Sequence, residues 1–112
     1  MNPIPIVHFC AAVVTASVSV PMIRRKVKMN DWYGVRIRES FESEAAWYEI
    51  NEYGGRLLLA WSALIAATAM VGMFLERRYW LTYNWTAVVI IGGGLALVIA
   101  KILVYARKRK RA

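Results

Sequence analysis

Residues 57–75 read LLLAWSALIAATAMVGMFL, a stretch without a charged side chain. The hydrocarbon core of a bilayer is about 30 Å thick and each helical residue rises about 1.5 Å, so roughly 20 apolar residues cross it. The stretch therefore predicts a membrane-spanning helix. Residues 85–105, WTAVVIIGGGLALVIAKILVY, predict a second one, because their single charge, Lys101, lies near the end and its amine can reach the headgroups.

A third apolar stretch covers residues 4–23 and is more polar than the other two. It contains His8, Thr15, Ser17 and Ser19, and prolines stand at positions 3, 5 and 21. A cleaved signal peptide is the alternative interpretation, but no basic residue precedes the apolar stretch, which disfavours it. We therefore expect a third membrane span here.

Three spans define the expected fold. Inside a bilayer the backbone must satisfy its own hydrogen bonds, so each span should be helical. The sequence thus predicts an all-α integral membrane protein, one domain of 112 residues, with transmembrane helices at about 4–23, 57–75 and 85–105. A partly helical cytoplasmic loop, residues 24–56, and a basic tail, residues 106–112, complete it.

The chain is strongly basic, with 15 Lys and Arg residues against 7 Asp and Glu. These cations cluster beside apolar stretches, which favours anionic lipid over nucleic acid as their partner. The residues that we expect to face lipid headgroups are Arg24, Arg25, Lys26, Arg107, Lys108, Arg109, Lys110 and Arg111.

The same charges predict an orientation. Seven Lys and Arg residues lie in segment 24–56 and five in the tail, against two between the second and third spans. Cytoplasmic segments carry the excess of positive charge in membrane proteins. We expect a multi-pass protein of the inner (plasma) membrane with its N-terminus outside and its C-terminus in the cytoplasm.

Small residues predict where helices pack. Lipid solvates apolar side chains as well as a neighbouring helix does, so membrane helices associate where small residues let backbones approach. Gly92, Ala96 and Ala100 repeat every four residues along the third span and are the expected packing stripe. The glycine triplet at 92–94 lacks the strand and lysine of a nucleotide-binding loop.

Segment 24–56 contains a predicted helix over residues 44–53. Ser43 suits its N-cap and Glu44 its first turn, and Gly54 and Gly55 allow the helix to stop or bend. Trp47 lies on its apolar face. We expect this helix to lie along the inner membrane surface.

Two interpretations of the polar and aromatic residues of segment 24–56 remain open. In one, the rings are interfacial anchors and the charges form a solvated surface that neutralises itself. In the other, Gly34 permits a tight turn that presents Arg36 beside aromatic faces, where its guanidinium can hold a carboxylate or a lipid phosphate. Asn30 and Asn51 would then bracket that site.

A resemblance to a known family rests on Asn30, Trp32, Tyr33, Gly34, Val35 and Arg36, followed by Ser40, Ser43, Trp47, Asn51 and Gly55, just before a membrane span. This pattern resembles the SdpI family of bacterial membrane proteins, which is named for immunity to a secreted peptide toxin. The resemblance implies a membrane-embedded protein that protects against or senses a membrane-active peptide. It marks as candidate binding residues Asn30, Trp32, Gly34, Arg36, Ser43, Trp47, Asn51 and Gly55.

The residues argue against catalysis, because no nucleophile, base and orienting group are assembled. His8 and Cys10 point to different sides of a helix, so we expect no metal and no cofactor. No acidic residue lies inside a span, which argues against a coupled exporter. A holin-like protein or an accessory subunit of a membrane complex is the alternative function. A hydrophobic peptide, another membrane protein and a second copy of the chain remain open as partners.

Overall fold

The structure, a computed structural model, describes residues 1–111, and all of the regular secondary structure in them is helical. Their order is α1 (Ile4–Ile23), the 3-10 turn η1 (Arg38–Phe41), α2 (Glu44–Met73), the 3-10 turn η2 (Arg77–Tyr79) and α3 (Trp80–Arg111). Three helices are long and apolar enough to cross a membrane. The predicted fold class and its three spans are therefore confirmed.

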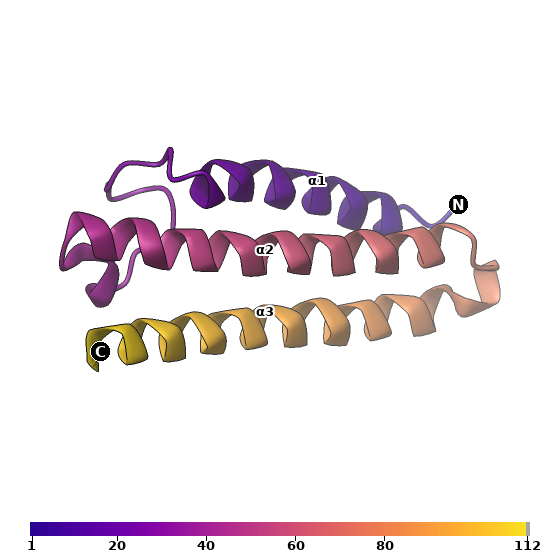
Figure 1. Cartoon of the computed structure of the whole chain (residues 1–112). Helices are drawn as coiled ribbons and strands as arrows, with labels where there is room; N and C mark the ends of the chain where they lie inside the picture. Colours follow the sequence, from indigo (N-terminus) through magenta and orange to yellow (C-terminus); the bar gives the residue numbers. More distant parts are fainter. Residues whose placement is uncertain (112) are drawn as a thin grey trace.

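The three long helices lie side by side, with α2 between α1 and α3 (Figure 1). The molecule measures 52 × 24 × 18 Å along its principal axes. One end holds the N-terminus and the α2–α3 connection, and the other holds the C-terminus and the long α1–α2 segment (Figure 1). We call the first the connection end and the second the loop end.

The helices differ in length in a way that shapes the loop end. α1 has 20 residues, α2 has 30 and α3 has 32, which correspond to about 30, 45 and 48 Å. Only α1 matches the thickness of the hydrocarbon core of about 30 Å. At the loop end α2 and α3 therefore continue beyond the length that a bilayer can cover.

The expectation of a separate surface helix over 44–53 is wrong. α2 runs without interruption from Glu44 through Gly54 and Gly55 into the span, so its first turns prolong that helix instead of lying along the membrane surface. Glycine at position 55 instead lets α1 come close to α2, because a Cβ there would lie 3.0 Å from the Ser19 carbonyl oxygen and from Met22 Cβ. Gly55 is where α1 packs against α2.

The predicted packing stripe on α3 lies on an exposed face of the helix. Gly92, Ala96 and Ala100 are exposed, and a Cβ at Gly92 would meet nothing within 4 Å. The contact is made at Gly94, where a Cβ would lie 2.8 Å from the Trp61 ring. The Trp61 indole nitrogen also donates a hydrogen bond of 3.0 Å to the Ile91 carbonyl, so this bulky side chain, and not the densest row of small residues, selects the packed face of α3.

At the connection end, α1 and its preceding residues reach α3 through polar side chains. Asn2 donates a hydrogen bond of 3.0 Å to the Asn84 side-chain oxygen, and His8 Nδ1 lies 3.1 Å from the Tyr83 hydroxyl. Polar contacts between helices in lipid each stabilise association by about 1 kcal/mol. These contacts join the two outer helices across the end of α2.

Gly92 and Gly94, two residues apart on α3, allow a matched test of this packing. Gly94→Leu should lower the free energy of unfolding by about 1–3 kcal/mol, because the new side chain overpacks the contact with Trp61. Gly92→Leu should leave the melting temperature unchanged or raise it, since its side chain enters open space. Thermal unfolding in detergent, followed by circular dichroism, measures both; equal losses would contradict the packing of α3 described above.

Candidate functional site

The loop end carries an ordered cap, which we define as segment 24–43, residues 44–54 of α2 and residues 102–110 of α3. Its interior continues the packing of the helices. Ile50, Ile102 and Ala106 are buried together, in one cluster with Val98. The rings of Tyr53 and Tyr105 stack beside them with their centroids 4.1 Å apart. The cap is thus a packed extension of the bundle.

Asn51 holds segment 24–43 onto α2. Its side chain is buried, its Oδ1 accepts a hydrogen bond of 2.6 Å from the Val35 backbone nitrogen, and its Nδ2 donates to the carbonyls of Trp47 and Val35. Gly34 has a φ of +109°, and a Cβ there would lie 2.5 Å from Asn51 Oδ1. Glycine is needed both for this conformation and for the close approach.

Trp47 is a second anchor and is completely buried. Its indole nitrogen donates a hydrogen bond of 2.8 Å to the Val27 carbonyl, and its ring packs against Phe41 at 5.4 Å. A buried indole normally needs such a partner for its N–H. The interpretation of Trp47 as an interfacial anchor is therefore wrong: the ring fastens the chain to itself.

Asn30 and two serines shape the backbone of the same segment. Asn30 Oδ1 accepts hydrogen bonds from the Trp32 and Tyr33 backbone nitrogens at 2.9 and 2.6 Å, which forms an Asx turn. Ser40 both accepts from the Ile37 nitrogen and donates to the Ile37 carbonyl. Ser43 accepts a hydrogen bond of 3.0 Å from the Ala46 nitrogen, which confirms it as the N-cap of α2.

The predicted site around Arg36 is not assembled. The Arg36 guanidinium is exposed and donates to the Asp31 carbonyl, whereas the aromatic rings that lie under a guanidinium in the described residues are Trp80 and Tyr79, beside Arg77 and Arg78. The asparagines that should bracket the site are engaged by backbone. Of the eight candidate binding residues, Asn30, Gly34, Ser43, Trp47 and Asn51 build the cap. Gly55 lies just outside it, where α1 packs against α2.

Two candidate binding residues, Trp32 and Arg36, point outward. Trp32 is 77% exposed, although its neighbour Tyr33 is tied down by donation of its hydroxyl to the Val18 carbonyl. Sequence reasoning did not place Tyr33 against α1, because nothing local indicates a partner fifteen residues earlier in the chain. The segment is thus folded back beside α1 with the Trp32 ring on its surface.

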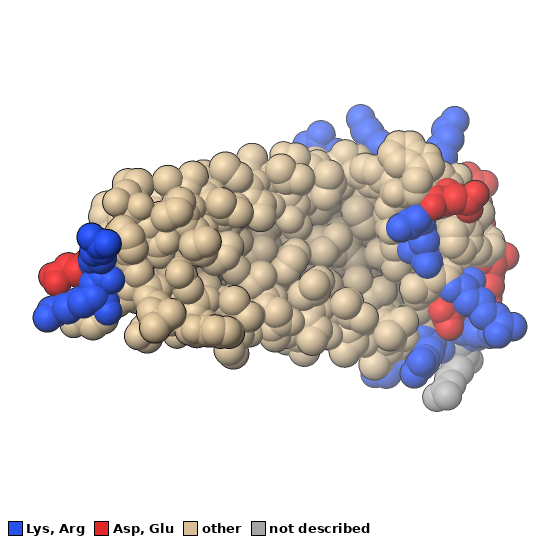
Figure 2. Space-filling view, turned by 180° about the vertical axis from the view of Figure 1, so that it is seen from behind, with Lys and Arg blue, Asp and Glu red and all other residues tan. Residues whose placement is uncertain are grey.

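Charged side chains cluster at both ends of the molecule and leave an uncharged belt between them on the face that Figure 2 shows. At the loop end several are paired: Arg25 with Glu52 at 3.0 Å, Lys110 with Glu42 at 3.0 Å, and Arg109 with Glu49. The hydrogen bond from Arg25 lowers the pKa of the Glu52 carboxyl, which precedes the apolar part of α2.

Some of the basic residues that are expected to face lipid form ion pairs. Arg25, Arg109 and Lys110 bind glutamates of the cap, although Arg25 and Lys110 remain exposed. Arg109 and Lys110 reach these glutamates because α3 continues as a helix to Arg111. Arg24, Lys26, Arg107 and Lys108 are exposed, as a contact with headgroups requires. The side chain of Arg111 lies outside the described residues.

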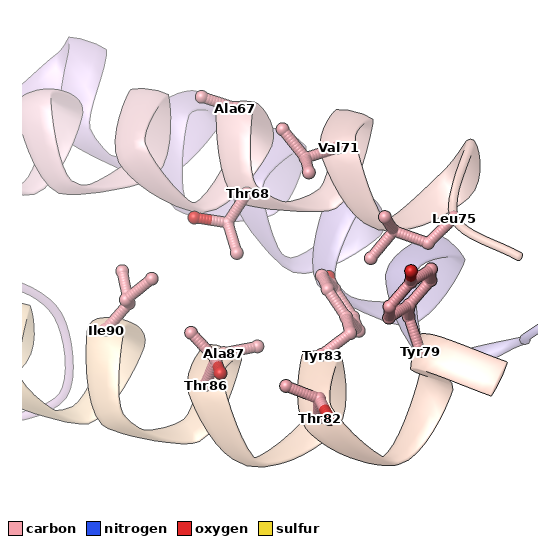
Figure 3. Close-up of a pocket in the computed structure, with 10 residues that line it drawn as sticks. All are labelled: Ala67, Thr68, Val71, Leu75, Tyr79, Thr82, Tyr83, Thr86, Ala87 and Ile90. Carbon is pink, nitrogen blue, oxygen red and sulfur yellow. The ribbon is translucent and has the colours of Figure 1, made fainter.

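A groove between α2 and α3 lies near the connection end and has a volume of about 420 Å³ (Figure 3). Tyr83 lies over Gly72 and, with Tyr79, reaches toward α2. Aliphatic side chains form half of the lining, and three threonine hydroxyls add polar groups. The lining residues are Ala67, Thr68, Val71, Leu75, Tyr79, Thr82, Tyr83, Thr86, Ala87 and Ile90.

Asn51→Leu should loosen the cap, because it removes the acceptor of the Val35 N–H and leaves that group unsatisfied at a cost of about 1–3 kcal/mol. Limited digestion with proteinase K in detergent should then cut segment 24–43 faster than in the original protein. Arg36→Ala, whose side chain is exposed, is the control and should be cut at the original rate. Equal rates for all three proteins would show that Asn51 does not hold the segment.

The cap and its two supporting helices coincide with a family match. A family model described as the SdpI/YfhL protein family matches residues 26–106, which begins just after α1 and ends in the last turns of α3. No curated protein and no solved structure shows a significant match to the chain. The match covers most of the sequence and contains Asn30, Gly34, Trp47 and Asn51, which hold segment 24–43 onto α2 or shape its backbone, so the chain belongs to the SdpI/YfhL protein family.

Proposed function

We propose that this chain is a protective membrane protein of the SdpI type, which binds a membrane-active peptide and performs no catalysis. Its family membership supports the role. The observation that carries the binding step is the groove between α2 and α3, because a peptide dissolved in the bilayer can enter it sideways without first reaching water. Its volume of about 420 Å³ falls within the usual range of about 300–1,000 Å³ for ligand pockets.

The position of the groove suits a peptide that arrives from outside the cell. The excess of Lys and Arg at the loop end supports a cytoplasmic location for the cap under the positive-inside rule. The groove, near the opposite end, then opens into the outer half of the bilayer. A secreted peptide that inserts from the exterior would meet the groove before it had crossed the membrane.

The lining of the groove suits a hydrophobic helical peptide. Its aliphatic walls can take up side chains, and the hydroxyls of Thr82 and Thr86 can bond to polar groups that the peptide would otherwise leave unsatisfied in lipid. The Thr68 hydroxyl already donates a hydrogen bond of 2.9 Å to the Leu64 carbonyl, but its oxygen can still accept one from a peptide N–H. The exposed Arg36 and Trp32 remain available at the cytoplasmic end to relay the bound state to a partner.

Survival of toxin-sensitive cells tests the proposal. Expression of the chain should protect cells against the secreted peptide toxin of the SdpI system, and Thr86→Trp, which fills the groove, should abolish protection at an equal level of membrane-inserted protein. Ala96→Trp, on the exposed face of α3, is the matched control and should still protect. Absence of protection by the original chain would overturn the protective role, and full protection by Thr86→Trp would overturn the groove as its site.

A holin-like role is the second candidate. The exposed stripe of Gly92, Ala96 and Ala100 favours it, because small residues on a lipid-facing surface let a second copy approach closely. In that case expression alone should collapse the membrane potential, as reported by a potential-sensitive dye. An unchanged potential at high expression would exclude the holin-like role and leave the protective one standing.

A further inference from the structure

We propose that segment 26–33 and the last turns of α1 form a binding site for one anionic phospholipid. Its phosphate would lie between Lys26 and Lys28, and one acyl chain would occupy the apolar cavity beside Trp32. The site is at the loop end, far from the α2–α3 groove, and does not depend on the protective role.

Segment 26–33 lies beside α1, below the end of that helix at the loop end. The Tyr33 hydroxyl donates to the Val18 carbonyl, and Val18 lies five residues before the last residue of α1, Ile23. At about 1.5 Å per residue the ring of Tyr33 therefore reaches some 7 Å below the end of a helix that just spans the hydrocarbon core. The segment is folded back into the level where headgroups meet acyl chains.

Two adjacent cavities lie at this level, one lined by cationic and polar side chains and the other by apolar ones, as a phospholipid headgroup and acyl chain would require. The first, about 390 Å³, is lined by Lys26, Lys28 and Asn30 among others. The second, about 270 Å³, is lined mainly by aliphatic side chains, including Val18, Met22, Val35 and Leu58. Trp32 and Tyr33 line both cavities, and their rings pack edge to face at 5.8 Å. A cationic surface thus passes into an apolar one across two aromatic rings.

The charges around the first cavity favour an anion. Lys26 and Lys28 are exposed and form no ion pair with the described side chains, whereas the neighbouring Arg25 is engaged by Glu52. Asp31, the one carboxylate of segment 24–33, does not line either cavity. Both lysine ammonium groups are therefore available to a phosphate.

The exposed apolar side chains identify the ligand as a lipid and not a soluble phosphate. Trp32 is 77% exposed and Met29 is 40% exposed, and both line the first cavity. Tryptophan is enriched where membranes meet water, because its ring is apolar and its N–H is polar. An acyl chain covers such a ring, which a free phosphate cannot do.

Titration of the delipidated full-length protein in detergent, followed by native mass spectrometry, tests the site. The original protein should retain one phosphatidylglycerol molecule at concentrations where phosphatidylcholine does not bind. Lys26→Gln/Lys28→Gln should weaken that binding by more than about tenfold, since each cation contributes roughly fivefold to attraction for anionic lipid. Trp32→Ala should weaken it as well.

Arg38→Gln/Arg56→Gln is the control, because neither residue is among those expected to face lipid headgroups. It removes the same charge from exposed residues at the same end, outside both cavities, and should bind phosphatidylglycerol like the original protein. Equal loss in both double variants would show diffuse attraction and overturn the site. Equal binding of the two lipids would also overturn it, as would equal binding of soluble glycerophosphate, because the acyl chain would then contribute nothing.

Discussion

A hydrocarbon core of about 30 Å accommodates about twenty helical residues, and α1 has 20 where α2 and α3 have 30 and 32. The extra turns of α2 lie at its N-terminal end and those of α3 at its C-terminal end, so in an antiparallel pair both emerge at the same end of the molecule. There they lack the cover of α1. Segment 24–43 supplies that cover, and the family motif is found where it packs against α2.

The cover requires polar side chains because an irregular segment has no hydrogen-bond ladder of its own. Its backbone groups must be satisfied by something nearby. Asn30, Ser40, Trp47 and Asn51 do this, each through a side-chain hydrogen bond to the backbone of residues 27–37. Most residues of the family motif therefore bind the chain's own backbone and no ligand. The motif residues that can contact other molecules are those that point away from α2, namely Trp32 and Arg36.

The two ends of the protein are built differently. The cap is held by buried hydrogen bonds, stacked tyrosines and several ion pairs. Exposed ion pairs stabilise a fold only weakly, so the buried contacts matter most. Near the connection end α2 and α3 line a groove of about 420 Å³. A packed cap with an open groove in the bilayer suits a protein that must take up a hydrophobic partner without losing its fold, as the proposed protective role requires.

Local sequence was sufficient to predict the three spans, the bounds of α1, the N-cap at Ser43 and the position of Trp47 on the apolar face of α2, because these depend on neighbouring residues. Tertiary contacts decided the rest. A glycine pair permits either a bend or a close approach, and only the position of α1 against Gly55 selects the second. Likewise Trp61, thirty residues before Ile91, selects the face of α3 that packs, and glutamates distant in sequence decide which cations form ion pairs. Partners that meet only in the folded chain leave no local pattern in the sequence.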